Sequence, residues 1–149
     1  MSRIDAKTHS KAFTGIKYED FSLYENYSRV HGLLGKGFTI LMAIYNSERG
    51  ITQRDICNCT FSTKQVVNAA IKNWLDEGYV YLTVKEDDRR TKAVMMTEKG
   101  REYASKILDP LAEAEVIAMK TLKSHEQKQL IELYTKYNCK LRELLEDNH

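Results

Sequence analysis

Side chains whose hydrogen-bonding groups match the edges of DNA bases lie close together on one predicted helix, which begins near Ser62. Gln65 and Asn68 each carry an amide that can pair with adenine through two hydrogen bonds, and Lys64 can reach guanine or a phosphate. Val66 can contact the methyl group of thymine. Residue types of this kind on one helix are typical of a helix that enters the major groove.

The opposite side of this helix is apolar, with Val67, Ala70, Ile71 and Trp74 spaced so that they face a core. The side chains left on the exposed side and at the helix start form the candidate reading surface: Ser62, Thr63, Lys64, Gln65, Val66, Asn68, Ala69 and Lys72. Two of them have simpler explanations. Gln65 stands three residues after Ser62, so capping of the helix is as good a role as base contact. Lys72 is more simply a solvated lysine.

A second cluster of charges lies between two predicted strands, residues 79–84 and 93–96, which are rich in β-branched and aromatic residues. The pattern predicts a β-hairpin whose charged tip spans residues 86–91. The candidate DNA-contacting side chains of this hairpin are Asp88, Arg89, Arg90 and Lys92. Arginine favours a narrow minor groove, where the negative potential is deepest. The alternative is a charged turn that only contacts water.

Another short helix is predicted from Gln53 to Cys59, because Thr52 and Asp55 have the spacing of a capping box. At the start of this helix, Thr52 and Arg54 are expected to position phosphates through a hydroxyl group, a positive charge and the helix N-terminus.

Composition limits the remaining classes of function. The chain has 149 residues and a net charge of only +2, so a nucleic-acid surface must concentrate its positive charge locally. Three cysteines and four scattered histidines lack metal-ligand spacing, and no cofactor is expected. No catalytic motif is found, so an enzyme is not expected. The chain has no apolar run of membrane-spanning length and no secretory signal, and it is expected to be cytoplasmic.

The element order predicts a mainly α-helical fold with a small β-hairpin, a winged helix-turn-helix with flanking dimerisation helices. Residues 1–17 are expected to be a flexible arm, and residues 38–100 the winged helix-turn-helix domain. Residues 18–37 and 101–149 carry apolar stripes that flank a compact module. A second copy of the chain is the simplest partner for these stripes.

Three segments resemble the MarR family of bacterial transcriptional regulators. Residues 88–100, DRRTKAVMMTEKG, resemble the family's wing, D-x-R followed by L-T-x-x-G, with Met96 in the place of the usual leucine. Residues 52–56, TQRDI, fit T-Q-x-x-L/I at the start of the helix-turn-helix, and residues 63–80 fit the recognition helix and the glycine that ends it. The resemblance covers residues 38–104 well, and the flanking segments only in their helix layout.

The resemblance implies a homodimer that binds a palindromic operator in double-stranded DNA, with Asp88 bracing Arg90. A repressor is expected, and an activator stays open. The resemblance also implies a small-molecule effector, for which Tyr24, Tyr27 and Tyr45 are candidate pocket residues. Tyrosines on an apolar helical stripe are, however, more often part of the core. Two alternatives remain: a winged helix that binds protein, and a redox sensor acting through Cys57, whose thiol is more simply buried and inert. The sequence assigns no redox role to Cys59 or Cys139.

Overall fold

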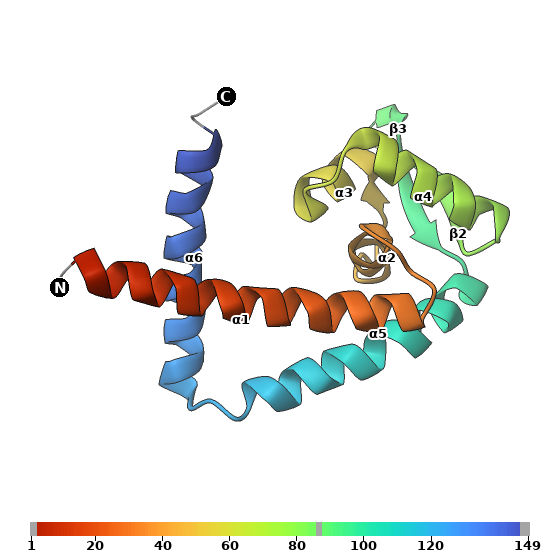
Figure 1. Cartoon of the computed structure of the whole chain (residues 1–149). Helices are drawn as coiled ribbons and strands as arrows, with labels where there is room; N and C mark the ends of the chain where they lie inside the picture. Colours follow the sequence, from red (N-terminus) through yellow and green to blue (C-terminus); the bar gives the residue numbers. More distant parts are fainter. Residues whose placement is uncertain (1–2, 86–87, 147–149) are drawn as a thin grey trace. The chain divides into compact units, whose positions relative to one another are not determined.

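The computed structural model describes residues 3–85 and 88–146, and this part of the chain is mostly helical (Figure 1). Its helices and strands follow one another as α1 (Arg3–Val30), α2 (Gly37–Tyr45), β1 (Ile51–Thr52), α3 (Gln53–Thr60), α4 (Lys64–Asp76), β2 (Val80–Lys85), β3 (Asp88–Met96), α5 (Glu98–Met119) and α6 (Ser124–Glu146). Two compact units make up the chain, residues 1–107 and 108–149. The expected fold class is therefore confirmed.

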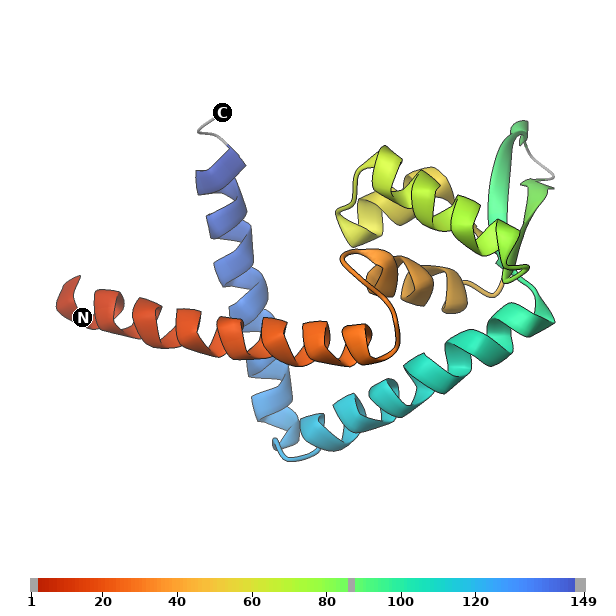
Figure 2. The ribbon, with the colours of Figure 1, turned by 45° about the vertical axis from the view of Figure 1, so that its right-hand side comes forward.

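The first unit holds the hydrophobic core. Helices α2, α3 and α4 pack on one another and on a three-stranded antiparallel sheet of order β1-β3-β2 (Figure 2). Side chains from all of these helices are fully buried, including Leu41, Ile56 and Ile71. Burial of such side chains is the main favourable contribution to folding. The helix-turn-helix and its hairpin thus share one core, which α5 extends with Ala104 and Ile107.

The sheet contains one strand that the sequence did not predict. Strand β1 has only two residues, and Ile51 and Thr52 pair with Val94 and Ala93 of β3. A two-residue strand is too short to show an alternating pattern, which is the usual signal for a strand. This pairing joins the start of α3 directly to the hairpin.

Helix α1 corrects the expectation of a flexible arm over residues 1–17. The described part of that segment, from Arg3 onward, is the first half of a 28-residue helix. Because it contains no proline and only Gly15 as a helix-weakening residue, its polar composition is compatible with a solvated helix. The polar composition of this segment therefore does not indicate that it is flexible.

The caps of α3 and α4 differ in how well they were predicted. Thr52 is the N-cap of α3, as expected, and its side chain accepts a hydrogen bond from the backbone N–H of Asp55. The N-cap of α4 is Thr63, not Ser62, and it accepts from the N–H of Val66. The hydroxyl of Ser62 is instead within 2.7 Å of the Thr60 hydroxyl, so it belongs to the preceding turn.

The hairpin is longer than the sequence predicted. Strand β3 begins at Asp88, five residues before Ala93, so Arg90 belongs to a strand and not to the tip. The pairing of β2 with β3 shifts between Val84, which faces Lys92, and Lys85, which faces Asp88. The β3 residues 89–91 lie between these two pairs, and such an irregularity re-aims side chains. Charged residues obscured a strand that continues through them.

Helix α5 is anchored where it leaves the sheet. The Thr97 hydroxyl accepts from the N–H of Gly100 and donates to the carbonyl of Gly78. A Cβ atom at Gly100 would collide with the carbonyl oxygen of Tyr79. The rings of Tyr79 and Tyr103 stack with centroids 4.2 Å apart. This close approach explains why glycine occupies position 100.

The second unit contains the end of α5 and all of α6. Among the described residues of α6, none is buried. No helix in residues 3–85 and 88–146 is long and apolar enough to cross a membrane.

Candidate nucleic-acid interface

Helix α4 presents its polar side chains to solvent and its apolar side chains to the core. Val67, Ile71 and Trp74 are buried, and Ala70 is half-buried. The side chains predicted for the reading surface are exposed, except for Ser62, which is half-buried: Thr63, Lys64, Gln65, Val66, Asn68, Ala69 and Lys72. Because Thr63 provides the N-cap, Gln65 has lost the capping partner that the sequence offered it, Ser62. Its amide is exposed at the start of α4.

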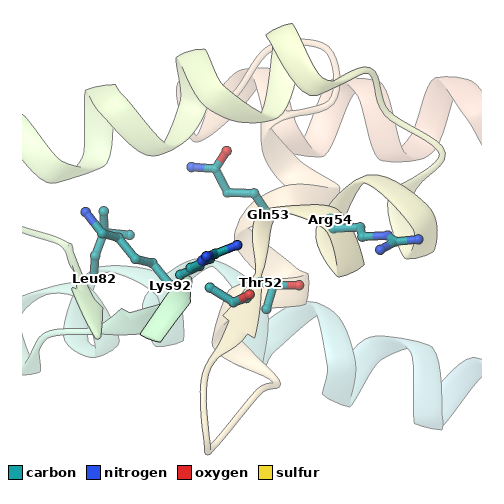
Figure 3. Close-up of a pocket in the computed structure, with 7 residues that line it drawn as sticks. Thr52, Gln53, Arg54, Leu82 and Lys92 are labelled. Carbon is teal, nitrogen blue, oxygen red and sulfur yellow. The ribbon is translucent and has the colours of Figure 1, made fainter. Parts of the chain in front are cut away.

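A hollow of about 420 Å³ separates the start of α3 from the hairpin (Figure 3). Lys92 and Leu82 lie on one side of it, and Thr52, Gln53 and Arg54 on the other. Arg90 and Thr91 complete the lining. The structure therefore brings together two groups of predicted site residues that are separated by more than thirty positions in the sequence.

A second hollow, of about 320 Å³, lies between α3 and the start of α4. It is lined by Gln53, Arg54, Cys57, Asn58 and Lys64. Gln53 and Arg54 thus border both hollows, and they connect Lys64 of α4 to Arg90 and Lys92 of the hairpin. We call the surface formed by Arg54, Lys64, Arg90 and Lys92 the basic surface. All of its members are exposed.

The charged side chains that line the two hollows are all positive. No Asp or Glu lines either hollow among the described residues. Four cationic side chains around two joined hollows create the local positive charge that the chain's net charge of +2 does not reveal. Arginine and lysine side chains in this arrangement suit the phosphate groups of a nucleic-acid backbone.

Thr52 does not have the free hydroxyl that the sequence suggested. Only 7% of the residue is exposed, and its hydroxyl oxygen caps α3. Its neighbour Gln53, which the sequence analysis left out, lines both hollows and carries an amide. Its position in the sequence could have indicated Gln53, because the residue after an N-cap lies in the first turn of a helix, where anions bind.

The side chains of Asp88 and Arg89 lie outside the described part of the structure. The expected brace between Asp88 and Arg90 therefore stays a prediction. Arg90 itself is exposed on β3, beside the start of α3. Arg90 lies where the register of the hairpin shifts, so this candidate DNA contact is on strand β3 and not at the tip.

Two of the three tyrosines proposed for an effector pocket, Tyr24 and Tyr27, lie beside Phe38, each with its ring centroid 6.4 Å from that of Phe38. Tyr24 lines a hollow between α1 and α2, together with Phe21 and Phe38. The hydroxyl of Tyr27 donates to the carbonyl of Ile107, at 2.5 Å, so this residue ties α1 to α5. Tyr45 does not line this hollow. Of the three tyrosines, Tyr24 therefore lines this hollow, and Tyr27 is its neighbour on the same helix.

The cysteines are all free thiols. Cys57 is half-buried beside Lys64, and Cys59 and Cys139 are exposed. Within residues 3–85 and 88–146, no group of three His, Cys, Asp or Glu side chains is placed to hold a metal ion.

Comparison with known proteins places the site in context. The model of the MarR family matches residues 31–91. The transcriptional regulator SarZ of Staphylococcus aureus is 30% identical over 93 residues, which is 62% of this chain and 60% of SarZ, so less than two thirds of that relative is matched.

Solved structures show the same fold. NMB1585, a MarR family regulator from Neisseria meningitidis, aligns over 100% of both chains with a TM-score of 0.77 and 19% identity. MepR of S. aureus in its DNA-binding conformation aligns over 89% of this chain and 98% of MepR, with a TM-score of 0.74 and 22% identity. A MepR–DNA complex aligns with a TM-score of 0.68 and 21% identity over 88% of this chain and 96% of MepR.

Proposed function

We propose that this chain, whose residues 31–91 match the model of the MarR family, is a sequence-specific, DNA-binding transcriptional regulator of that family. The observation that carries the proposal is the basic surface. Gln53 and Arg54 border two adjoining hollows, one reaching Lys64 and the other reaching Arg90 and Lys92. Lys64 of α4 is thus linked to Arg90 and Lys92 of the hairpin through the two residues that line both hollows.

The proposed docking follows from this arrangement. Helix α4 enters the major groove, where Gln65 and Asn68 pair with adenine edges and Val66 contacts a thymine methyl group. Lys64 and Arg54 hold the phosphates on either side of the groove. Arg90 and Lys92 contact the neighbouring backbone or the minor groove, where a positive charge is attracted most strongly. Phosphate contacts fix the register, and base contacts supply the specificity.

A homodimer is the proposed binding form. Helix α6 has apolar side chains at three- and four-residue steps, and Leu130, Leu133 and Leu144 on this stripe are 45%, 65% and 51% exposed. Such a stripe on a soluble helix needs a partner, and a second copy offers an identical one. Two copies related by two-fold symmetry read a palindromic operator.

Repression, exercised in the cytoplasm, is the proposed outcome of operator binding. A small-molecule effector is the proposed modulator, and the hollow lined by Tyr24 is its candidate site. Support for this part comes from family resemblance and from the hollow alone. No catalytic activity is proposed.

The test is selection of bound duplexes from a random DNA pool by the full chain. Enrichment of a two-fold symmetric motif is expected, because each copy of the dimer reads one half of it. If no motif is enriched at moderate salt, DNA reading fails as a function, and a winged helix that binds protein takes its place. An enriched motif without symmetry would remove the dimer from the proposal.

A further inference from the structure

The turn between α3 and α4 contains a strained and exposed aromatic residue, Phe61. Its backbone is left-handed, with φ 54° and ψ 41°, and it is the one non-glycine residue with positive φ among the described residues. Glycine, and less often asparagine, is the usual residue at such a helix C-terminus, because a Cβ atom is unfavourable in this conformation. Burial of the phenyl ring does not offset this strain, since 75% of Phe61 is exposed.

Hydrogen bonds on both sides hold Phe61 in this conformation. Its own N–H donates to the carbonyl of Cys57, and the N–H of Ser62 donates to the same oxygen. The hydroxyl of Thr60 donates to the carbonyl of Ile56, and the ammonium group of Lys36 donates to the carbonyl of Thr60. The turn is therefore fixed by its neighbours, and the ring is presented from a rigid base. Strain of this kind, maintained by its surroundings, is concentrated at functional sites.

The surroundings of the ring indicate its partner. Phe61 stands two residues before the N-cap of α4, next to the exposed side chains of Thr63, Lys64 and Gln65. An interface with another protein would be expected to present a broad apolar surface, whereas these neighbours are polar or cationic and only Val66, 42% exposed, adds an apolar side chain to the first turn of α4. A surface with positive charge and amides around one aromatic ring suits DNA, whose grooves offer both phosphates and apolar thymine methyl groups.

We propose that Phe61 is an apolar DNA contact that packs against a thymine methyl group at the edge of the groove read by α4. This inference rests on the proposed function. It adds a specificity-determining residue in the turn, outside the helix and the hairpin. The ring is presented from the turn that precedes α4, on a backbone held in the left-handed conformation.

Three variants separate the ring from the strain. Phe61→Asn tolerates the left-handed backbone and removes the ring, Phe61→Gly removes both, and Phe61→Leu keeps an apolar side chain together with the strain. Melting temperatures are expected to be at or above the parent value for Phe61→Asn, and near the parent value for Phe61→Leu. Affinity for the selected duplex, measured by fluorescence anisotropy, is expected to follow a different order: parent, then Phe61→Leu, then Phe61→Asn and Phe61→Gly. The last two are expected to bind roughly five- to tenfold more weakly.

A change in the DNA gives the matched control. Replacing each thymine of the selected duplex by uracil, one at a time, removes one methyl group. At one position the parent is expected to lose affinity, while Phe61→Gly is expected to lose none there. The salt dependence of Phe61→Gly should equal that of the parent, because no phosphate contact is lost, whereas Lys64→Ala should flatten it.

Two results would overturn the inference. If Phe61→Gly binds the selected duplex as tightly as the parent, or if no uracil position distinguishes the two proteins, the ring does not contact a thymine methyl group. The proposed function would survive either result, because the parent still binds. If the parent itself enriches no DNA motif, the proposed function and this inference fail together.

Discussion

Helices α4 and α6 are both largely exposed on one side, but the two exposed sides differ in chemistry. On α4 the exposed side carries lysine and amide groups, such as Lys64, Gln65 and Asn68, and its other side is sealed into a core. On α6 no described residue is buried, and large apolar side chains such as Leu133 and Leu145 are 65% and 59% exposed. Exposure alone therefore says little, and the chemistry of the exposed side indicates the class of partner.

This difference suggests that the proposed function has two requirements, DNA binding and assembly, which different parts of the chain meet. The module of α2, α3, α4 and the sheet supplies most of the buried core, to which α5 adds Ala104 and Ile107. The apolar side of α6 would be unfavourable in water without a cover. In the proposed function, DNA is therefore read by the first unit, and the chain assembles through the second.

The largest effect is expected from a matched pair of leucine truncations. Leu41→Ala in α2 removes a side chain that is 0% exposed, and we expect it to lower the free energy of unfolding. The expected loss is about 2–5 kcal/mol. Leu133→Ala in α6 should change the unfolding of the dilute monomer by less than about 0.5 kcal/mol. Urea unfolding at low protein concentration measures both. Equal losses of unfolding free energy would show that α6 has a core of its own, which would contradict the difference between the two units.

The next effect is the loss of assembly. Leu133→Glu places a charge on the apolar stripe of α6, so it should dissociate the dimer and weaken operator binding by about a hundredfold, because two linked half-site contacts become one. Thr135→Glu adds the same charge at an exposed position away from that stripe and serves as the control. Sedimentation and anisotropy together report both properties. A dimer that persists in Leu133→Glu would assign assembly to another surface.

A smaller effect is expected from the hairpin. Arg90→Ala removes one cation of the basic surface, and operator binding should weaken about tenfold, within the 1–3 kcal/mol typical of one good contact. Arg29→Ala removes an exposed arginine at the end of α1, which bonds to Asn26, and should leave binding unchanged. Should the two variants weaken binding equally, net charge and not the placement of Arg90 would explain the effect.

The smallest effect concerns the anchor of α5. Burial, followed by the nearby Tyr79 and Glu77, raises the pKa of Tyr103 above its ordinary value of 10.0. The unfolded chain then loses this proton at a lower pH than the folded protein, so stability is complete below pH 10 and decreases as the pH rises through the folded-state pKa. The melting temperature of the parent, relative to Tyr103→Phe, should therefore decrease above pH 10. Parallel pH profiles for the two proteins would show that Tyr103 does not contribute in this way.

The sequence predicted the fold wherever a periodic pattern and a cap occurred together. Val67, Ile71 and Trp74 gave the buried side of α4, and Thr52 gave the start of α3. Patterns failed where polarity or charge hid regular structure, as in the first half of α1 and in β3 from Asp88 onward. Strand β1 was too short to be recognised before its partner was known.

The candidate site was predicted by residue type, but its continuity was not. Lysine and amides on α4 and arginine near the hairpin were visible in the sequence. The joining role of Gln53 depends on two hollows that meet at the start of α3, which no local pattern encodes. The left-handed conformation of Phe61 was equally hidden, because sequence rules expect glycine there.

The central claim is that the basic surface and the exposed side of α4 read DNA sequence. The most direct test is anisotropy titration of the parent protein, at physiological salt, with the duplex selected from the random pool and with a scrambled duplex of the same composition. We expect the selected duplex to bind roughly a thousandfold more tightly, the lower range for specific regulators. Equal affinities for the two duplexes would contradict the claim, because the surface would then recognise charge without reading bases.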